Sequence, residues 1–254
     1  MTDWSLGIDI GSATIKIALF KSGNLQATDY RFHYGDISGC LQSLLAPWLD
    51  LKARIALTGS GSRAFPAEFQ VDEIVAAIEG TRWALGHNFR SLLIIGGEKI
   101  RLIELDSDGI YRRHISNTDC ASGTGSFLEQ QAARLGLSLK EFENLAASYQ
   151  GEIPVIASRC SVFALTDLIH RQQEGYSLAS LAAGVSRGVA RAIADAIIKG
   201  RKLEPPLYVA GGGSIHRRLL SSLQELIRVE VARIPGGELI TSVGGALLAS
   251  NEAS

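Results

Sequence analysis

Two segments of the chain show the same alternation of hydrophobic and small residues. The first runs from Leu6 to Phe20 and the second from Leu93 to Leu105, and each pattern predicts two β-strands joined by a glycine turn. At an offset of 85 residues (96 − 11), Gly11 of the first segment falls on Gly96 of the second. Because such a repeat constrains the architecture before any site is considered, it predicts a duplicated α/β domain with nucleotide between the two halves.

Strand and helix patterns fill the rest of the chain. Strands are predicted at residues 27–32, 54–57, 111–116 and 207–210. Helices are predicted at 37–46, 71–85, 137–148 and 215–227, within 176–202, after the Gly123-Thr124-Gly125 turn, from the Cys160 segment towards Glu174, and at the end of the chain. Ser138 followed by Glu141 has the spacing of a capping box, which marks a helix start. No linker or low-complexity stretch divides the chain. We therefore expect an N-terminal subdomain at residues 1–90 and a C-terminal subdomain at 91–254, with the change near Arg90.

Composition and charge narrow the class of protein. Apolar residues make up 46% and charged residues 20% of the 254 residues, which is typical of a globular protein. The net charge of -1 gives no support for nucleic-acid binding, and no apolar run approaches the length of a membrane span. The chain moves straight into a strand pattern, without the features of a signal peptide. We therefore expect a cytoplasmic protein whose partners include neither nucleic acid nor membrane.

Four glycine turns are candidates for holding phosphate. They are Gly11-Ser12-Ala13 with Thr14, Gly96-Gly97 with Glu98, Gly123-Thr124-Gly125, and Gly211-Gly212-Gly213. Glycine permits positive φ and close backbone approach, both of which a phosphate cradle needs. Any one of them alone is more simply a tight turn, but four turns, two of them related by the repeat, favour nucleotide binding. No Walker sequence is present, so the predicted site is of another type.

Asp9 is the candidate catalytic residue, because it lies in an apolar strand beside the first turn. A carboxylate there is costly unless it is paired or near a metal. Two interpretations stay open: binding of Mg²⁺ through water, or a hydrogen-bonded carboxylate of the turn. Lys16, on one face of the next strand, either reaches a phosphate or is an exposed strand lysine.

Three cysteines are too few for a disulfide framework, and two of them are candidate metal ligands. Cys120 and Cys160 each stand at a predicted helix N-terminus, where the helix dipole favours the thiolate. A lone cysteine is usually a small buried hydrophobe, as we expect for Cys40. An iron–sulfur cluster takes four cysteines, and a two-fold homodimer would supply them as 2 + 2.

The most specific stretches are Asp119-Cys120-Ala121-Ser122-Gly123-Thr124-Gly125 and Ser158-Arg159-Cys160-Ser161. With the glycine turns, they resemble the ATPases of the actin, acetate kinase and heat-shock chaperone type. More narrowly, the chain resembles the BadF/BadG/BcrA/BcrD-type ATPases, which are activators of 2-hydroxyacyl-CoA dehydratases and ATPase subunits of benzoyl-CoA reductase. The resemblance covers nearly the whole chain.

The resemblance implies an α/β fold of the duplicated actin/acetate-kinase (ribonuclease H-like) type, with two subdomains around a nucleotide cleft. It implies one [4Fe-4S] cluster held by Cys120 and Cys160 of both chains of a homodimer, and ATP or ADP with Mg²⁺. The positions matched to nucleotide motifs are Asp9, Gly11, Ser12, Thr14, Lys16, Gly211, Gly212, Gly213 and Gly244. The implied activity is ATP-dependent electron transfer to a second iron–sulfur protein of the dehydratase or reductase type. A ferredoxin or flavodoxin-like protein would be the donor.

The chain departs from the family's motifs at several positions. The second phosphate motif usually reads Asp-Ile-Gly-Gly-Gln-Asp, whereas this chain has Ile94 and Lys99 in place of the two aspartates. This loss puts the rate of ATP hydrolysis in doubt. Two other hypotheses follow. One is a small-molecule kinase of the amino-sugar type with Asp119 as base, and the other is a nucleotide-binding regulator that does not hydrolyse ATP.

Overall fold

The structure, a computed structural model, describes residues 3–117, 125–158 and 161–251. The chain forms two compact units. Unit 1 consists of Met1–Asn88 together with Ile234–Ser254, and unit 2 of Phe89–Arg233. The boundary at Phe89 lies next to the position at which the sequence predicts a change of subdomain. The C-terminal segment groups with unit 1, although the sequence placed it with residues 91–254.

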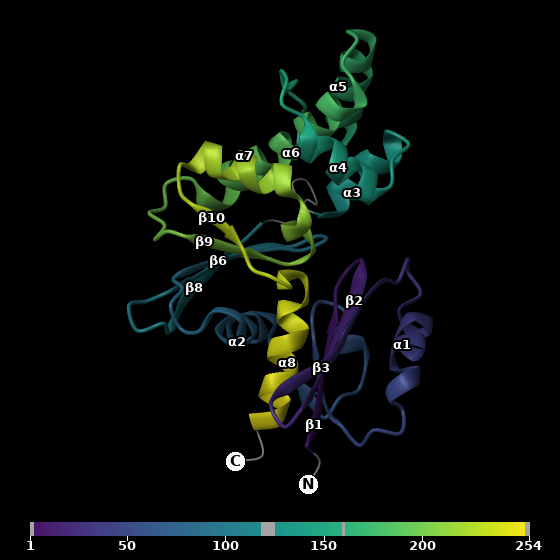
Figure 1. Cartoon of the computed structure of the whole chain (residues 1–254), viewed down its shortest axis with the longest axis vertical. Helices are drawn as coiled ribbons and strands as arrows, with labels where there is room; N and C mark the ends of the chain where they lie inside the picture. Colours follow the sequence, from purple (N-terminus) through teal and green to yellow (C-terminus); the bar gives the residue numbers. More distant parts are fainter. Residues whose placement is uncertain (1–2, 118–124, 159–160, 252–254) are drawn as a thin grey trace. The chain divides into compact units, whose positions relative to one another are not determined.

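Each unit contains a five-stranded mixed sheet, and the two sheets have the same topology (Figure 1). In unit 1 the order is β3 (Asn24–Phe32), β2 (Thr14–Lys21), β1 (Trp4–Ile10), β4 (Arg54–Thr58) and β5 (Phe69–Gln70). In unit 2 it is β8 (Tyr111–Ser116), β7 (Ile100–Leu105), β6 (Ser91–Ile95), β9 (Leu207–Ala210) and β10 (Val231–Arg233). In both, the first three strands pair antiparallel and the others parallel. The predicted duplicated α/β fold is confirmed.

The strands of unit 1 bury side chains on both faces of their sheet, because successive side chains of a strand point to opposite faces. On one face, Leu6, Ile8 and Ile10 of β1 pack in a core with α1 (Ile37–Leu45). On the other face, Ala18 and Phe20 of β2 pack against α8 (Ile240–Asn251). The sheet is therefore covered by a helix on each side.

Glycines allow α8 to lie very close to its neighbours. A β-carbon on Gly7 of β1 would overlap with the carbonyl oxygen of Ser242 in α8. On another side of α8, Gly244 packs against Ala76 of α2 (Glu73–Leu85), and a β-carbon there would overlap with the Ala76 carbonyl oxygen. Gly244, which the resemblance matches to a closing nucleotide turn, therefore lies inside a helix and in a backbone-to-backbone contact.

Unit 2 adds a set of helices to its sheet. They are α3 (Gly125–Arg134), α4 (Leu139–Ser148), α5 (Ser161–Gln173), α6 (Leu178–Ile193), a π-helical turn η3 (Ala194–Ile198) and α7 (Arg217–Ile227). The predicted capping box is confirmed, because Ser138 caps α4 and Glu141 returns a hydrogen bond to the Ser138 backbone. The core of unit 2 joins β6, β7 and β9 to α3, α4 and α6. Over the described part of the chain, no helix has the length and apolar character needed to cross a bilayer.

Candidate functional site

The first glycine turn joins β1 to β2. The Gly11 N–H donates to the Thr14 carbonyl at 2.9 Å and closes the hairpin. His33, which is buried, braces the turn from the end of β3: its backbone N–H donates to Ala13 O, and its ring Nε2 lies 3.2 Å from Gly11 O. Because the Gly35 N–H donates to Nδ1, Nε2 carries the hydrogen and donates to Gly11. The turn is therefore held from two sides.

Asp9 and Lys16 form a buried ion pair beside this turn. They are register partners on β1 and β2, and Lys16 Nζ lies 3.0 Å from Asp9 Oδ2. The exposed fractions are only 5% for Asp9 and 9% for Lys16, so the pair is shielded from water. Burial lowers the pKa of Lys16, but the charge and hydrogen bond of Asp9 outweigh it and hold that pKa above the usual value. Lys16 is therefore a buried cation, not an exposed strand lysine.

A third group holds the same carboxylate. The hydroxyl of Thr241, in the first turn of α8, donates to Asp9 Oδ2 at 2.5 Å. Thr241 is itself buried, and it comes from the far end of the chain. The interpretation of Asp9 as a hydrogen-bonded carboxylate is therefore correct for this structure. A water-mediated contact with a metal ion remains compatible with it, because an ionised carboxylate has about four acceptor positions.

A second glycine turn of unit 1 follows β4. Gly59 has φ +91°, and a β-carbon there would lie 2.5 Å from the Ile10 carbonyl oxygen at the end of β1. The Gly61 N–H donates to that same carbonyl at 2.9 Å. The turn therefore packs against the carboxyl ends of two parallel strands, which is where α/β sheets bind ligands.

Unit 2 repeats the first turn at the 85-residue offset. The Gly96 N–H donates to the Lys99 carbonyl at 2.8 Å, as Gly11 does to Thr14. Two further N–H groups, those of Gly125 and Ser126 at the start of α3, donate to the carbonyls of Gly96 and Gly97. A β-carbon on Gly125 would lie 3.1 Å from Gly96 O, a tight contact that shows how closely the helix start approaches this turn. The start of α3 is therefore fixed directly to the Gly96 turn.

Asn117 braces this turn from the end of β8. Its Oδ1 accepts from the Ile100 N–H at 2.8 Å, and its Nδ2 donates to the Glu98 carbonyl at 3.0 Å. At the position that corresponds to Asp9, unit 2 has the buried Ile94, whose register partner is Arg101. The backbone of the repeat is thus retained while the carboxylate is absent.

Gly211 to Gly213 follow β9 and lie against the end of β6. Gly211 has φ +84°, and its β-carbon would lie 2.5 Å from the Ile95 carbonyl oxygen. A β-carbon on Gly213 would overlap with the Ile95 side chain, just as one on Gly61 would crowd the Ile10 side chain. Because Ile95 is Ile10 shifted by 85 residues, the second glycine turn is repeated as well. The sequence did not reveal this second correspondence.

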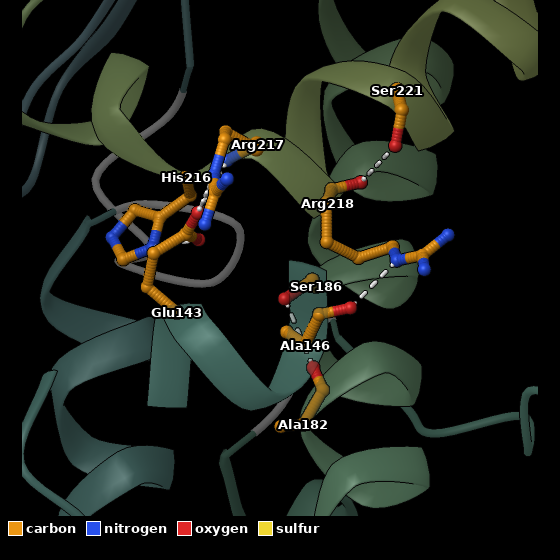
Figure 2. A network of polar contacts seen from close by, with 8 residues as sticks. All are labelled: Glu143, Ala146, Ala182, Ser186, His216, Arg217, Arg218 and Ser221. Carbon is orange, nitrogen blue, oxygen red and sulfur yellow. Dashed lines mark hydrogen bonds and ion pairs between the residues drawn. The ribbon is translucent and has the colours of Figure 1, made fainter. Parts of the chain in front are cut away.

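A charged cluster fixes the chain directly after the Gly211 turn. Figure 2 shows Glu143 of α4 facing His216 and Arg217 at the start of α7. Glu143 Oε1 accepts from the Arg217 backbone N–H at 3.1 Å and from its Nε at 3.0 Å, and Oε2 lies 3.4 Å from His216 Nδ1. Burial raises the pKa of Glu143, but the nearby His216 ring and the two hydrogen bonds from Arg217 prevail and hold that pKa below the usual value. Glu143 thereby caps α7.

The described residues place most of the predicted nucleotide residues on these turns. Asp9, Gly11, Ser12, Ala13, Thr14 and Lys16 lie on the first hairpin, Gly96, Gly97 and Glu98 on the second, Gly125 at the start of α3, and Gly211, Gly212 and Gly213 after β9. Cys120, Cys160, Asp119, Gly123 and Thr124 lie outside the described residues. Sequence reasoning missed Thr241, His33, Asn117 and Gly59 as members of the site. Only Gly59, in a Gly-x-Gly after a strand, carried a local signal.

Comparison with known proteins identifies the relatives of this chain. The sequence profile of the BadF/BadG/BcrA/BcrD ATPase family matches residues 50–249. The YjiL protein of Escherichia coli is 29% identical over 252 residues, 96% of each chain, and the activator of lactoyl-CoA dehydratase of Anaerotignum propionicum is 28% identical over 264 residues, 97% of each. The structure of the activator of 2-hydroxyisocaproyl-CoA dehydratase from Clostridium difficile with bound ADPNP superposes with a TM-score of 0.90. It is 24% identical and covers 98% of this chain and 95% of its own.

Proposed function

The chain belongs to the BadF/BadG/BcrA/BcrD ATPase family, and from this membership we propose that it is an ATP-dependent activator of a dehydratase or reductase. The observation that carries the proposal is the match to the lactoyl-CoA dehydratase activator over 97% of both chains. The proposed partner is an enzyme of the 2-hydroxyacyl-CoA dehydratase or benzoyl-CoA reductase type.

The glycine turns described above are the proposed ATP and ADP site. A side chain at Gly96 or Gly211 would crowd a neighbouring backbone carbonyl, so both turns are restricted to glycine. Turns without β-carbons let backbone N–H groups approach phosphate oxygens. Gly11 to Thr14 and Gly96 to Glu98 would then contact phosphates, and Gly211 to Gly213 would contact the adenosine side, as in the motif that this chain resembles.

Asp9 and Lys16 supply the charges of the proposed site. Mg²⁺ in nucleotide sites keeps several waters and is held by one or two carboxylates together with phosphates. One buried carboxylate beside a phosphate turn fits that mode, and the described residues form no group of three or more ligands that could hold a metal on their own. When bound, the ion would neutralise phosphate charge. Lys16 would balance the same charge from the next strand.

An iron–sulfur cluster is the part of the proposal that concerns electron transfer. Its proposed ligands are Cys120 and Cys160 of two chains in a homodimer, around one [4Fe-4S] cluster that would supply a low-potential electron. Two observations support a connection between the proposed cluster ligands and the proposed nucleotide site. Helix α5 begins at Ser161, directly after Cys160, and α3 begins at Gly125, whose N–H donates to the Gly96 turn. The chain between Cys120 and that turn is thus only a few residues long.

Nucleotide at the Gly96 turn would act on α3 through these two backbone hydrogen bonds. Such a ligand shifts an equilibrium only by its different affinity for two states, so the proposal requires two conformations of the dimer. The electron would pass to a second iron–sulfur protein and be replaced by a ferredoxin or flavodoxin-like donor. With Ile94 and Lys99 in place of aspartates, ATP hydrolysis by this chain is proposed to be slow.

Anaerobic purification followed by iron and sulfide determination tests the proposal. We expect about four irons per dimer, with loss of iron in Cys120→Ala and Cys160→Ala and no loss in the matched control Cys40→Ala, since Cys40 packs in the core of unit 1. Release of phosphate from ATP is measured on the same samples. A cluster-free protein that phosphorylates an amino sugar would contradict the proposal and support a kinase.

A further inference from the structure

We propose that Thr241 is a positioning residue for Asp9, and that its hydroxyl orients the carboxylate toward the glycine turns. The inference rests on the proposed function, in which Asp9 is the carboxylate nearest the phosphates. It adds a residue from the C-terminal helix to the part of the proposed site that lies in unit 1, which is otherwise built from residues 9–61.

The two oxygens of Asp9 have different surroundings. Oδ2 accepts from both Lys16 Nζ at 3.0 Å and Thr241 Oγ1 at 2.5 Å. Oδ1 faces the turn after β4, where a β-carbon on Gly59 would overlap with it. Two donors thus hold one oxygen on the side of β2 and α8, and the other oxygen is directed at a glycine turn. This is the arrangement that a carboxylate needs if it is to present one defined oxygen to a ligand.

Lys16 alone would not fix that orientation. The terminal torsion of an aspartate is broad, so a carboxylate held by one donor can turn about its last bond. A lysine ammonium is a rotating point charge on a flexible four-carbon stem and imposes little direction. In the proposed function Lys16 is also attracted by phosphate, whereas Thr241 keeps its bond to Asp9. The hydroxyl is therefore the donor that gives direction.

The position of Thr241 is fixed by the packing of α8. Its neighbour Ser242 places a carbonyl oxygen against Gly7 of β1, so closely that no β-carbon fits. The same helix contacts α2 through Gly244 and Ala76. A helix held by backbone contacts on two sides cannot shift without cost, because packed interiors transmit small displacements. Thr241 thus stands on a rigid support opposite Asp9.

Adjacent hydroxyls on α8 provide a matched control. Ser242 is buried like Thr241, but its hydroxyl donates at 2.8 Å to the carbonyl of Leu239, the residue just before α8. Thr241→Val keeps the side-chain shape and removes the bond to Asp9, whereas Ser242→Ala removes a buried hydroxyl of α8 that does not contact Asp9. Thr241→Ser keeps the hydroxyl. The three variants separate the bond to Asp9 from the general effect of changing this helix.

The experiment is calorimetric titration of each protein with ATP, once with excess Mg²⁺ and once with EDTA, together with thermal unfolding. We expect the gain in ATP affinity that Mg²⁺ brings to fall about tenfold in Thr241→Val, since a hydrogen bond to a charged group is lost. Affinity without Mg²⁺ should stay within about twofold, because the glycine turns are unchanged. Thr241→Ser and Ser242→Ala should keep the wild-type gain.

Two results overturn the inference by itself. One is that Mg²⁺ raises the ATP affinity of Thr241→Val as much as that of the wild type. The other is that Thr241→Val and Ser242→Ala lose this Mg²⁺-dependent increase equally, which would show that α8 has a structural role only. If Thr241→Val does not fold, Thr241→Ala takes its place in the same comparison. Wild-type protein that binds no ATP in either buffer overturns the proposed function itself, and the inference with it.

Discussion

The hairpins of the two units have the same backbone and different side chains. In unit 1 the N–H of Gly11 closes the turn onto Thr14, and in unit 2 the N–H of Gly96 closes it onto Lys99, 85 residues later in both cases. The register pair in front of the turn is Asp9 with Lys16 in unit 1, but Ile94 with Arg101 in unit 2. Different residues therefore determine the backbone shape and the charge at these turns. The charged pair differs between the two units, while the backbone shape is the same.

The charged contacts near the glycine turns of unit 2 lie elsewhere and are less buried, since the exposed fraction of the side chain is 13% for Glu143 and 68% for Arg217. Glu143 approaches His216 and Arg217 after the second glycine turn, where it caps α7. Unit 1 has its buried ion pair at the first turn, and unit 2 has its cluster after the second. We infer that unit 1 is specialised to balance phosphate and metal charge, and unit 2 to hold the Gly211 turn and the start of α3 in place.

The largest predicted effect concerns the glycines that the two units share. Gly59→Ala and Gly211→Ala should each lower the free energy of unfolding by about 3 kcal/mol or more, because positive φ and overlap with the Ile10 or Ile95 carbonyl combine. Denaturant unfolding measures the effect. Gly23→Ala and Gly136→Ala also have positive φ but open space around them, so they should cost only about 1 kcal/mol. Equal costs in both sets would refute the close packing of the turns.

Removing the Asp9 carboxylate of unit 1 should give the next largest loss of stability. Asp9→Asn leaves the Lys16 ammonium buried without a counter-charge and should cost about 3 kcal/mol in chemical denaturation. The double variant Asp9→Asn with Lys16→Met removes both charges and should recover most of that loss. If the single variant costs under about 1 kcal/mol, Asp9 and Lys16 behave as a surface ion pair. The hairpin of unit 1 would then not differ from that of unit 2 by a buried charge pair.

Restoring the carboxylate in unit 2 would make the hairpins more alike. Ile94→Asp places a carboxylate where the family motif has one, and we expect about a tenfold rise in the rate of ATP hydrolysis from added electrostatic and water-orienting contacts. Phosphate release under saturating MgATP measures it. Ile94→Asn, which has the same shape without the charge, is the control. A rate that is unchanged in the aspartate variant would show that slow turnover has another cause.

The smallest predicted effect is the pH dependence of the stability that Glu143 contributes to unit 2. The folded pKa of Glu143 lies below its ordinary value near 4.5, so its stabilising contribution is complete above that pH and is lost as the pH falls through the lower folded pKa. Glu143→Gln should therefore cost about 1 kcal/mol at neutral pH, and the difference from wild type should shrink below about pH 4.5. Unfolding free energies between pH 3 and 7 test this sign. If the free-energy difference between wild type and Glu143→Gln grows as the pH falls, the stabilising role of the Glu143 carboxylate is contradicted.

Much of the fold could be predicted from the sequence because its signals are periodic. The strands at Tyr111–Ser116 and Leu207–Ala210 coincide with the structure, as does the capping box at Ser138. The edge strands β5 and β10 were missed, since segments of two and three residues show no alternation. The repeat of the hairpin was visible because its two copies have the same spacing. The repeat of the Gly59 turn at Gly211 could not be seen in the sequence, because the spacing differs: unit 2 has additional helices between its hairpin and its second turn.

The site was predictable only where a motif is local. Gly96 and Gly211 stand in short glycine-rich stretches and Gly11 follows a strand pattern, so the local sequence indicates the turns. Thr241 meets Asp9 across 232 positions of the chain, and nothing in its neighbourhood indicates that contact. The strand pattern allowed Lys16 to be either buried or exposed, because its burial depends on packing between elements that are distant in the sequence.

The central claim is that this chain uses ATP, with Asp9 at the phosphates. The most direct test is the release of phosphate from MgATP by anaerobically purified wild type and by the folded double variant Asp9→Asn with Lys16→Met. The account predicts slow but measurable hydrolysis by the wild type and a loss of at least about 100-fold in the variant. Equal rates in the two proteins, or no hydrolysis and no ATP binding by the wild type, would contradict it.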